Sequence, residues 1–282
     1  MPAGTVPHRA QRIRDLGAEC SVLDVNYDCC VERARDLAVS QGGLYIQDTA
    51  LESDTALERE TPLAIMQGYI TILSETSDQL DSSPTHVFLQ AGVGSFSGAL
   101  AAHLQHLHPT VTIVILEPRE ADCCWRSAQA GDGEARSVSG EMVTIMAGLC
   151  CGVPSVQGWP ILRRTAGWFL SCEDSVTSRG MRVLYSPLAG DTRVVSGESG
   201  AVCLGALYSI MTQDRHQHIR SQLGLYFVSE ESDPLSIIPQ VSPATAESSW
   251  SPQRETLTRR DSGTAFGPRG DCMGTMASVC TP

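Results

Sequence analysis

One short stretch, FLQAGVGSFSGAL at residues 88 to 100, restricts the fold more than any other part of this chain. An apolar run is followed by two glycines one residue apart and then by a helix-like segment rich in small residues. Gly92 and Gly94 allow a tight turn from a strand into a helix, because glycine adopts backbone conformations that are closed to other residues. Such a turn directs successive backbone N–H groups and the positive end of the helix dipole toward one point, where an anion can bind.

The glycine turn is typical of a phosphate site, although a ligand-free turn would have the same pattern. Ser95 adds a hydroxyl donor to the backbone donors. The Rossmann fingerprint is excluded, because the third glycine is missing at the required spacing. A Walker loop is also excluded, because it needs a lysine and all 20 lysine-plus-arginine residues of this chain are arginines.

Helical and strand patterns alternate at short intervals through the first two thirds of the chain. This alternation predicts an α/β fold with a mostly parallel open sheet flanked by helices. The expected helices are residues 7–16, 27–40, 62–80, 97–107, 142–149, 159–170 and 200–211. The expected strands are residues 19–24, 43–47, 85–90, 110–117 and 224–229.

Two further polar turns could belong to a ligand site. Asp48 directly follows the expected strand 43–47, and open α/β sheets place their ligands at the carboxyl ends of parallel strands. A helix cap or an ordinary loop carboxylate would explain Asp48 equally well. The segment SGESGA at residues 196–201 enters an apolar helix, and its simpler interpretation is a capped helix N-terminus.

The composition indicates which binding partners and which cellular compartment to expect. The net charge of −12 argues against nucleic acid and against an anionic membrane surface. The chain contains no apolar run that could span a bilayer and no signal-peptide pattern, which predicts a cytoplasmic protein. After residue 231 the chain becomes rich in Ser, Thr and Pro without an apolar period, and we expect residues 233–282 to form a disordered tail.

The 11 cysteines predict no metal site. No Cys-x-x-Cys spacing occurs, so zinc-ribbon and redox motifs are excluded. The histidines near residue 106 lack an accompanying carboxylate and fit a solvated helix end. We therefore expect most of the thiols to be buried as small apolar side chains.

Ten ordered blocks of the chain resemble the diaminopropionate ammonia-lyases, which belong to the tryptophan-synthase-β-like (fold type II) pyridoxal-phosphate enzymes. The resemblance extends from residue 1 to about residue 231 with few gaps. The blocks are LGAECSVLDVNYD, QDTALE, IMQGY, HVFLQAGVGSFSGA, EPREADCCWRS, TIMAGLCCGVPS, GWPIL, SCEDSV, GMRVL and SGESGAVCLG.

The resemblance implies a cofactor, a substrate and roles for individual residues. The residues implied to hold the 5′-phosphate of pyridoxal phosphate are Gly92, Val93, Gly94 and Ser95. Asp48 corresponds to an active-site carboxylate near the substrate, and Ser229 to a residue near the pyridine nitrogen. The implied reaction is the α,β-elimination of 2,3-diaminopropionate to pyruvate and ammonia, in which a lysine holds the cofactor as a Schiff base. A homodimer is expected by analogy alone.

The chain departs from the family pattern in ways that bear on activity. It contains no lysine, and the resemblance implies that it is N-terminally truncated, without the lysine-bearing segment and the Asp-Gly-Asn-His-Gly loop. We expect residues 1–55 to be the remainder of a smaller α/β domain and residues 56–232 to be a larger one. The chain as written is then an inactive ammonia-lyase; the alternative is a non-catalytic ligand-binding or regulatory protein. The resemblance also aligns Cys123 and Cys151, either as a disulfide or as two free thiols in contact.

Overall fold

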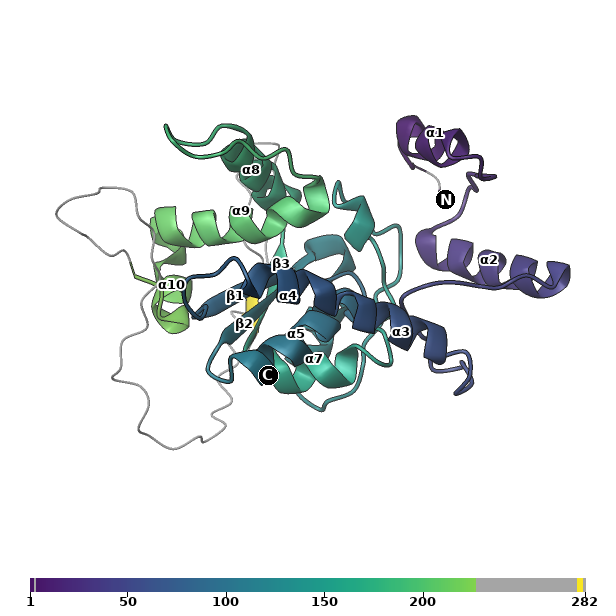
Figure 1. Cartoon of the computed structure of the whole chain (residues 1–282), viewed down its shortest axis with the longest axis horizontal. Coiled ribbons are helices and arrows are strands. Elements are labelled where there is room, and N and C mark those ends of the chain that lie inside the picture. Colours follow the sequence, from purple (N-terminus) through teal and green to yellow (C-terminus); the bar gives the residue numbers. More distant parts are fainter. Residues whose placement is uncertain (3, 227–277, 281–282) are drawn as a thin grey trace, which may run out of the picture.

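The computed structural model describes residues 1–2, 4–226 and 278–280, and a four-stranded sheet lies at its centre (Figure 1). The strands are β1 (His86–Gln90), β2 (Thr112–Pro118), β3 (Trp168–Cys172) and β4 (Ser278–Cys280). They lie in the order β1-β2-β3-β4; the first two pairings are parallel and the third is antiparallel. The predicted α/β class with a mostly parallel sheet is therefore confirmed.

The two faces of the sheet have separate apolar cores, because successive side chains of a strand point to opposite faces. Ile113 and Ile115 of β2 belong to one core, and Val114 and Leu116 belong to the other. The helices that contribute to the first core are α4 (Ile70–Ser77), α5 (Ser95–Leu107), α6 (Cys123–Ala130) and α7 (Trp159–Thr165). Those that contribute to the second are α8 (Asp174–Tyr185), α9 (Glu198–Thr212) and α10 (Gln217–Leu223).

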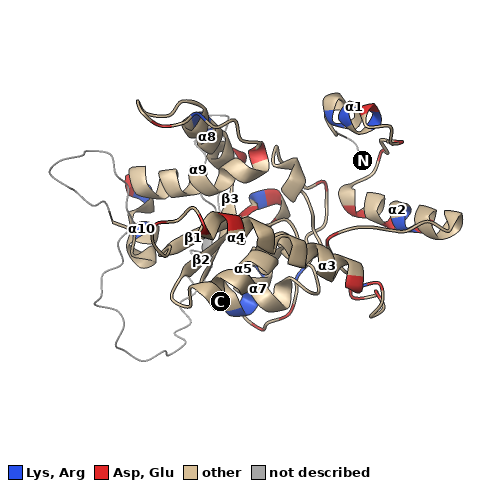
Figure 2. Cartoon of the chain, in the orientation of Figure 1, with Lys and Arg blue, Asp and Glu red and all other residues tan. Residues whose placement is uncertain are grey.

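Two glycines allow α8 and α9 to cross at very short range. A Cβ atom added at Gly180 would lie 2.0 Å from the carbonyl oxygen of Ala201, and one added at Gly205 would lie 2.0 Å from that of Val176. Figure 2 shows that α5, on the other side of the sheet, carries no Lys, Arg, Asp or Glu. Close packing therefore holds α5 in place without charged side chains, whereas α9 combines close packing on α8 with an ion pair between Glu198 and Arg9.

The strands expected at residues 19–24 and 43–47 are wrong. In the first, only Leu23 forms a bridge, with Pro2, and the second is extended without ladder partners. An apolar pattern makes a strand only where a neighbouring backbone supplies a series of hydrogen bonds, and the backbone bond described for the first segment, from the amide of Leu23 to the carbonyl of Met1 (2.9 Å), does not extend into a ladder. The helices α1 (Pro7–Asp15) and α2 (Tyr27–Gln41) form as expected and lie apart from the sheet in Figure 1.

The helix predictions in the middle of the chain need three corrections. The helix expected at 62–80 is divided at Tyr69 into α3 (Glu60–Gly68) and α4. The helix expected at 159–170 ends at Thr165, because the chain then turns to pair β3 with β2. The helix expected at 142–149 is only the short 3₁₀ turn η2 (Ala147–Leu149), since the preceding residues are a loop in which Met142 has a φ of 48°.

Several elements were not foreseen, and others lie outside the described residues. The pattern analysis missed α6, α8, α10 and the 3₁₀ turns η1 (Arg119–Ala121) and η3 (Asp214–His216). Of the strand expected at 224–229, the described residues 224–226 form a turn and coil. The expected tail 233–282 lies outside the described residues except for β4, so the remainder of that expectation stays a prediction.

In the part of the chain that the structure describes, none of the helices combines the length and the apolar character that a bilayer crossing requires.

Candidate functional site

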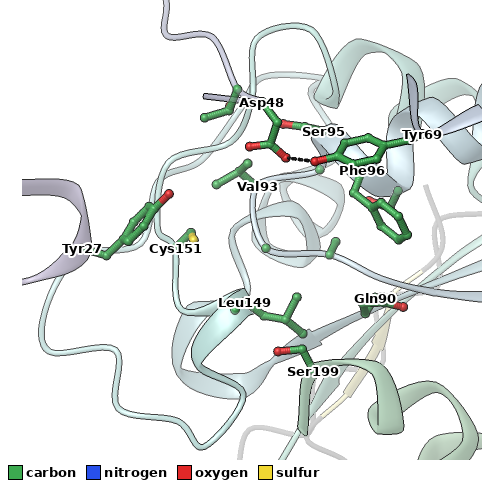
Figure 3. Close-up of a pocket in the computed structure, with 16 residues that line it drawn as sticks. Tyr27, Asp48, Tyr69, Gln90, Val93, Ser95, Phe96, Leu149, Cys151 and Ser199 are labelled. Carbon is green, nitrogen blue, oxygen red and sulfur yellow. Dashed lines mark hydrogen bonds between the residues drawn. The ribbon is translucent and has the colours of Figure 1, made fainter. Parts of the chain in front are cut away.

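A cavity of about 280 Å³ opens at the carboxyl end of β1, where the glycine turn connects the strand to α5 (Figure 3). Its walls come from segments that are far apart in the sequence, including the start of α2, the turn at residue 48, and the start of α9. The residues that line it are Tyr27, Asp48, Thr49, Tyr69, Gln90, Ala91, Gly92, Val93, Gly94, Ser95, Phe96, Ser97, Gly148, Leu149, Cys151 and Ser199.

The glycine turn has the backbone conformation that its sequence requires. Gly94 is the residue before α5 and has a φ of 93°, in the region that favours glycine. A Cβ atom at this position would also lie 2.9 Å from Cδ1 of Leu162. No side chain caps α5, and the amides of a first helical turn have no carbonyl partners within their own helix. These amides remain available to an anion.

Three buried hydroxyl groups around the turn lack hydrogen-bond partners. They belong to Thr49, Ser95 and Ser97, which are 6%, 1% and 0% exposed, and all three line the cavity. Within the described part of the chain, no other buried side-chain hydroxyl lacks a partner. Leaving a buried donor unsatisfied costs about 1–3 kcal/mol, so three such groups around one cavity indicate a site built for a polar ligand.

The segment from Ser155 to Gly158 holds two walls of the cavity together. The amide of Ser155 donates to the carbonyl of Val93 in the turn (2.8 Å), and the next amide, of Val156, donates to the carbonyl of Ala50 (3.2 Å). Residues 48–50 and the glycine turn are therefore held against the same short segment. This arrangement places Asp48 and Thr49 beside the turn.

Asp48 has a fixed partner at the cavity wall. The hydroxyl of Tyr69 donates to its Oδ2 atom at 2.9 Å, a contact drawn in Figure 3. The ring of Tyr69 in turn packs edge to face on Phe96, the second residue of α5, at a centroid distance of 5.2 Å. Burial, reinforced by the hydrogen bond to Asp48, raises the pKa of Tyr69 to about 12. Tyr69 therefore remains a donor throughout the physiological range.

Tyr27 extends from the first turn of α2 toward the same cavity and faces Cys151 in Figure 3. Burial is the main cause of a raised pKa at Tyr27, and the nearby Cys151 and Asp48 contribute to it. Both tyrosines of the cavity are thus neutral hydroxyls at pH 7. No Lys, Arg or His lines the cavity, so Asp48 is its single charged side chain.

A buried carboxyl group lies directly behind the turn. Glu117, at the end of β2, is fully buried and accepts hydrogen bonds from the amides of Cys124 (2.9 Å) and Trp125 (2.6 Å) in the first turn of α6. Burial raises its pKa to about 8 despite these two bonds. The thiol of Cys123 contacts the same carboxyl and donates to the carbonyl of Gly92 at 3.3 Å.

Among the described residues, one cluster of side chains could bind a metal ion, and it includes Glu117. The ligand atoms of Glu117, Cys123 and Cys124 lie within 4.8 Å of one another. Both carboxylate oxygens of Glu117 are already engaged by amides, which favours a structural role for this group. Cys123 and Cys151 are both free and buried, so of the two alternatives for this pair the structure has free thiols and no disulfide.

Five of the six residues predicted for the site line one cavity. They are Asp48, Gly92, Val93, Gly94 and Ser95. Ser229 lies outside the described residues. Sequence reasoning did not single out Thr49, Tyr69 or Ser97, and it treated Ser199 only as part of a capped helix end. Thr49 and Ser97 lie beside predicted residues, which is the one signal that could have found them, whereas Tyr69 has no local signal.

Comparison with known proteins identifies the family. The profile of a family described as pyridoxal-phosphate dependent enzymes matches residues 1–222. The chain belongs to this family. The predicted cofactor, pyridoxal phosphate, is therefore the cofactor of this family.

Within this family of pyridoxal-phosphate-dependent enzymes, the predicted resemblance to diaminopropionate ammonia-lyases is confirmed. The Escherichia coli K12 enzyme of that name is 44% identical over 234 residues, which cover 80% of this chain and 56% of the relative. The Salmonella typhimurium enzyme is 41% identical over 232 residues with the same coverages. The chain therefore spans about half the length of the curated relatives that it matches.

Solved structures give the same family and fold. The crystal structure of holo diaminopropionate ammonia-lyase from Escherichia coli superposes with a TM-score of 0.71 at 41% identity, covering 79% of this chain and 55% of that one. Serine racemase from maize, at 18% identity, has a TM-score of 0.59 over 73% of this chain and 56% of that one. The second similarity concerns the fold alone and agrees with the predicted fold type II class.

The residues around the turn fit the phosphate group of the family's cofactor. Free first-turn amides, a positive helix end and the unpartnered hydroxyls of Ser95 and Ser97 suit a phosphate dianion. A Cβ atom at position 94 would meet Leu162 and Cys124, which do not line the cavity, so glycine here lets the turn pack closely on the residues behind it. A covalent link to the cofactor has no candidate side chain here, because the sequence contains no lysine.

Proposed function

We propose that this chain binds pyridoxal phosphate through Gly92, Val93, Gly94 and Ser95 and belongs to an ammonia-lyase that converts 2,3-diaminopropionate to pyruvate and ammonia. The observation that supports this most directly is the cavity itself, which brings a phosphate-type turn and a carboxylate together. The identity of 41–44% to enzymes named diaminopropionate ammonia-lyase adds the substrate class.

Asp48 is the residue that we propose faces the substrate. A carboxylate that is the single charged side chain of the cavity attracts an ammonium group, and 2,3-diaminopropionate carries one amino group more than an ordinary amino acid. Tyr69 fixes the carboxylate through its hydroxyl. Ser229 is proposed to lie near the pyridine nitrogen by family resemblance alone.

When bound, pyridoxal phosphate supplies an electron sink for the charge that develops at the substrate Cα atom. The covalent attachment that such enzymes use needs a lysine, and these 282 residues contain none. The residues of this chain can bind the phosphate, orient the substrate and exclude water from the cavity. A lysine would have to come from outside these 282 residues.

The missing lysine also supports a second candidate function, a non-catalytic protein that binds pyridoxal phosphate or a related ligand through the same turn. Both candidates require the phosphate site, and they differ in turnover. For either, we propose that residues 1–55 and 56–232 form a smaller and a larger domain, that the chain forms a homodimer, and that it is cytoplasmic. Light scattering of the purified protein would test the dimer.

The substrate class can be tested with the purified chain, which without a lysine is not expected to turn the substrate over. We expect spectroscopic titration to show weak, reversible binding of pyridoxal phosphate that becomes tighter when 2,3-diaminopropionate is present. L-Alanine, which lacks the second amino group, is the matched control, and Asp48→Asn should remove the difference between the two amino acids. Release of ammonia and pyruvate would exclude the non-catalytic candidate. No preference for the diamino acid would contradict the proposed substrate class.

A further inference from the structure

We infer that Thr49 is an additional phosphate ligand, supplied by the segment that also carries Asp48. This inference rests on the proposed function, because it assigns a further residue to the same phosphate site. Thr49 is 6% exposed, lines the cavity, and its hydroxyl lacks a hydrogen-bond partner. A valine of nearly the same shape would fill the position without that cost, so the hydroxyl indicates a ligand.

The backbone places Thr49 next to the glycine turn. The consecutive amides of Ser155 and Val156 hold the carbonyls of Val93 and Ala50. Consecutive amides of a chain lie only a few ångströms apart, so the carbonyl that follows Thr49 and the carbonyl in the middle of the glycine turn are held close together. Thr49 therefore lies across the cavity wall from the helix that begins at Ser95.

The chemistry of the three unpartnered hydroxyls favours an anion. Ser95 and Ser97 project from the first turn of α5, where the backbone amides and the helix dipole already favour negative charge. A hydroxyl from a different segment can donate to the same group of oxygens from another direction. A phosphate has enough acceptor positions for the amides and all three hydroxyls.

Through Thr49, phosphate binding also fixes the position of the neighbouring carboxylate, Asp48. Thr49 follows Asp48 directly, so an anion held by the Thr49 hydroxyl also fixes the backbone that presents Asp48. The other end of Asp48 is held by Tyr69, which packs on Phe96 of α5. Phosphate binding and orientation of the substrate-facing carboxylate are thereby coupled through adjacent residues.

The test compares the binding of pyridoxal phosphate with that of pyridoxal, which lacks the phosphate, to the full chain. Thr49→Val removes the hydroxyl and keeps the shape, and we expect it to weaken pyridoxal phosphate binding about tenfold, the usual effect of one hydrogen bond to a charged acceptor. Pyridoxal binding should not change. Thr49→Ser restores a hydroxyl and should recover most of the affinity. The control is Thr165→Val, whose hydroxyl donates to the carbonyl of Ile161 in α7.

A structural role for Thr49 would give a different result. If the hydroxyl only supports the fold, Thr49→Val should lower thermal stability and weaken both ligands equally, which would overturn the inference. If the Thr49 hydroxyl serves to bind an anion, Thr49→Val without ligand should be as stable as the parent or more stable. Unchanged phosphate affinity in Thr49→Val, with binding still abolished by Gly94→Asp, would overturn the role of Thr49 alone. No binding of pyridoxal phosphate by the parent would overturn this inference and the proposed function together.

Discussion

Gly158 lies against the carbonyl of Gly94 so closely that a Cβ atom added at Gly158 would be 2.3 Å from that oxygen. Gly94 is the residue at which the chain turns from β1 into α5, and Gly158 is the N-cap residue of α7, which lies behind the turn. The contact is between two backbones, so neither side can yield by changing a rotamer. The shape of the phosphate-type turn therefore depends on a glycine 64 residues further along the chain.

The first prediction concerns this contact. Gly158→Ala should destabilise the protein by about 1–3 kcal/mol, the usual range for overpacking, and should weaken pyridoxal phosphate binding because the turn must move. Thermal unfolding and a binding titration measure the two effects. The control is Gly68→Ala, at a glycine with open space around it, which should be close to neutral. Unchanged affinity in Gly158→Ala would show that the turn tolerates displacement.

The second prediction separates charge from shape at the turn itself. Gly94→Asp should abolish binding of pyridoxal phosphate, because the new side chain meets Leu162 and Cys124 and displaces the turn, and because it adds a negative charge next to the phosphate site. Gly94→Asn has the same shape and the same tolerance of a positive φ but no charge, and should only weaken binding. A spectroscopic titration compares both with the parent. Equal affinity of parent and Gly94→Asp would place the ligand elsewhere.

The third prediction follows from the absence of lysine. Incubation with pyridoxal phosphate, reduction with borohydride and proteolysis should give no pyridoxyl group on any internal peptide. Labelling of the N-terminal amine is expected at most and serves as the internal control for the reduction. Mass spectrometry that finds a labelled internal side chain would refute this prediction.

The fourth prediction is a pH dependence that originates at Glu117. Burial raises its pKa from 4.5 to about 8 in the folded protein, so the folded state holds a proton that the unfolded chain releases between these values. The stability that this proton provides is complete below pH 4.5 and is lost as the pH rises to 8, by up to about 1.4 kcal/mol per pH unit. Urea unfolding between pH 5 and 9 should show this slope.

Glu117→Gln should flatten the slope, because glutamine does not titrate. Glu75→Gln, at an exposed position of α4, is the matched control and should retain it. The same slope in the parent and in Glu117→Gln would assign the dependence to other groups.

The sequence alone determined the part of the molecule that is local. The strand β1, the glycine turn and α5 are consecutive, and their apolar period and two glycines predict a strand, a positive φ and a helix without help from distant residues. The same local reasoning predicted α2 and α9. The residue count alone showed that no lysine is present to form a Schiff base. The fold class followed because the alternation of these elements leaves few other arrangements.

The tertiary structure decided what depends on pairing between distant residues. The segments 19–24 and 43–47 have strand patterns but obtain no ladder in the described chain, since hydrogen bonds to a neighbouring backbone are not encoded by the pattern. Asp48 acquires Tyr69 as its donor, and Thr49 is brought beside the turn by Ser155 and Val156, only because the folded chain returns to the same place. Apolar periodicity indicates which side of a helix or strand is buried. Which distant segment of the chain packs against that side is decided by the packing of the folded structure.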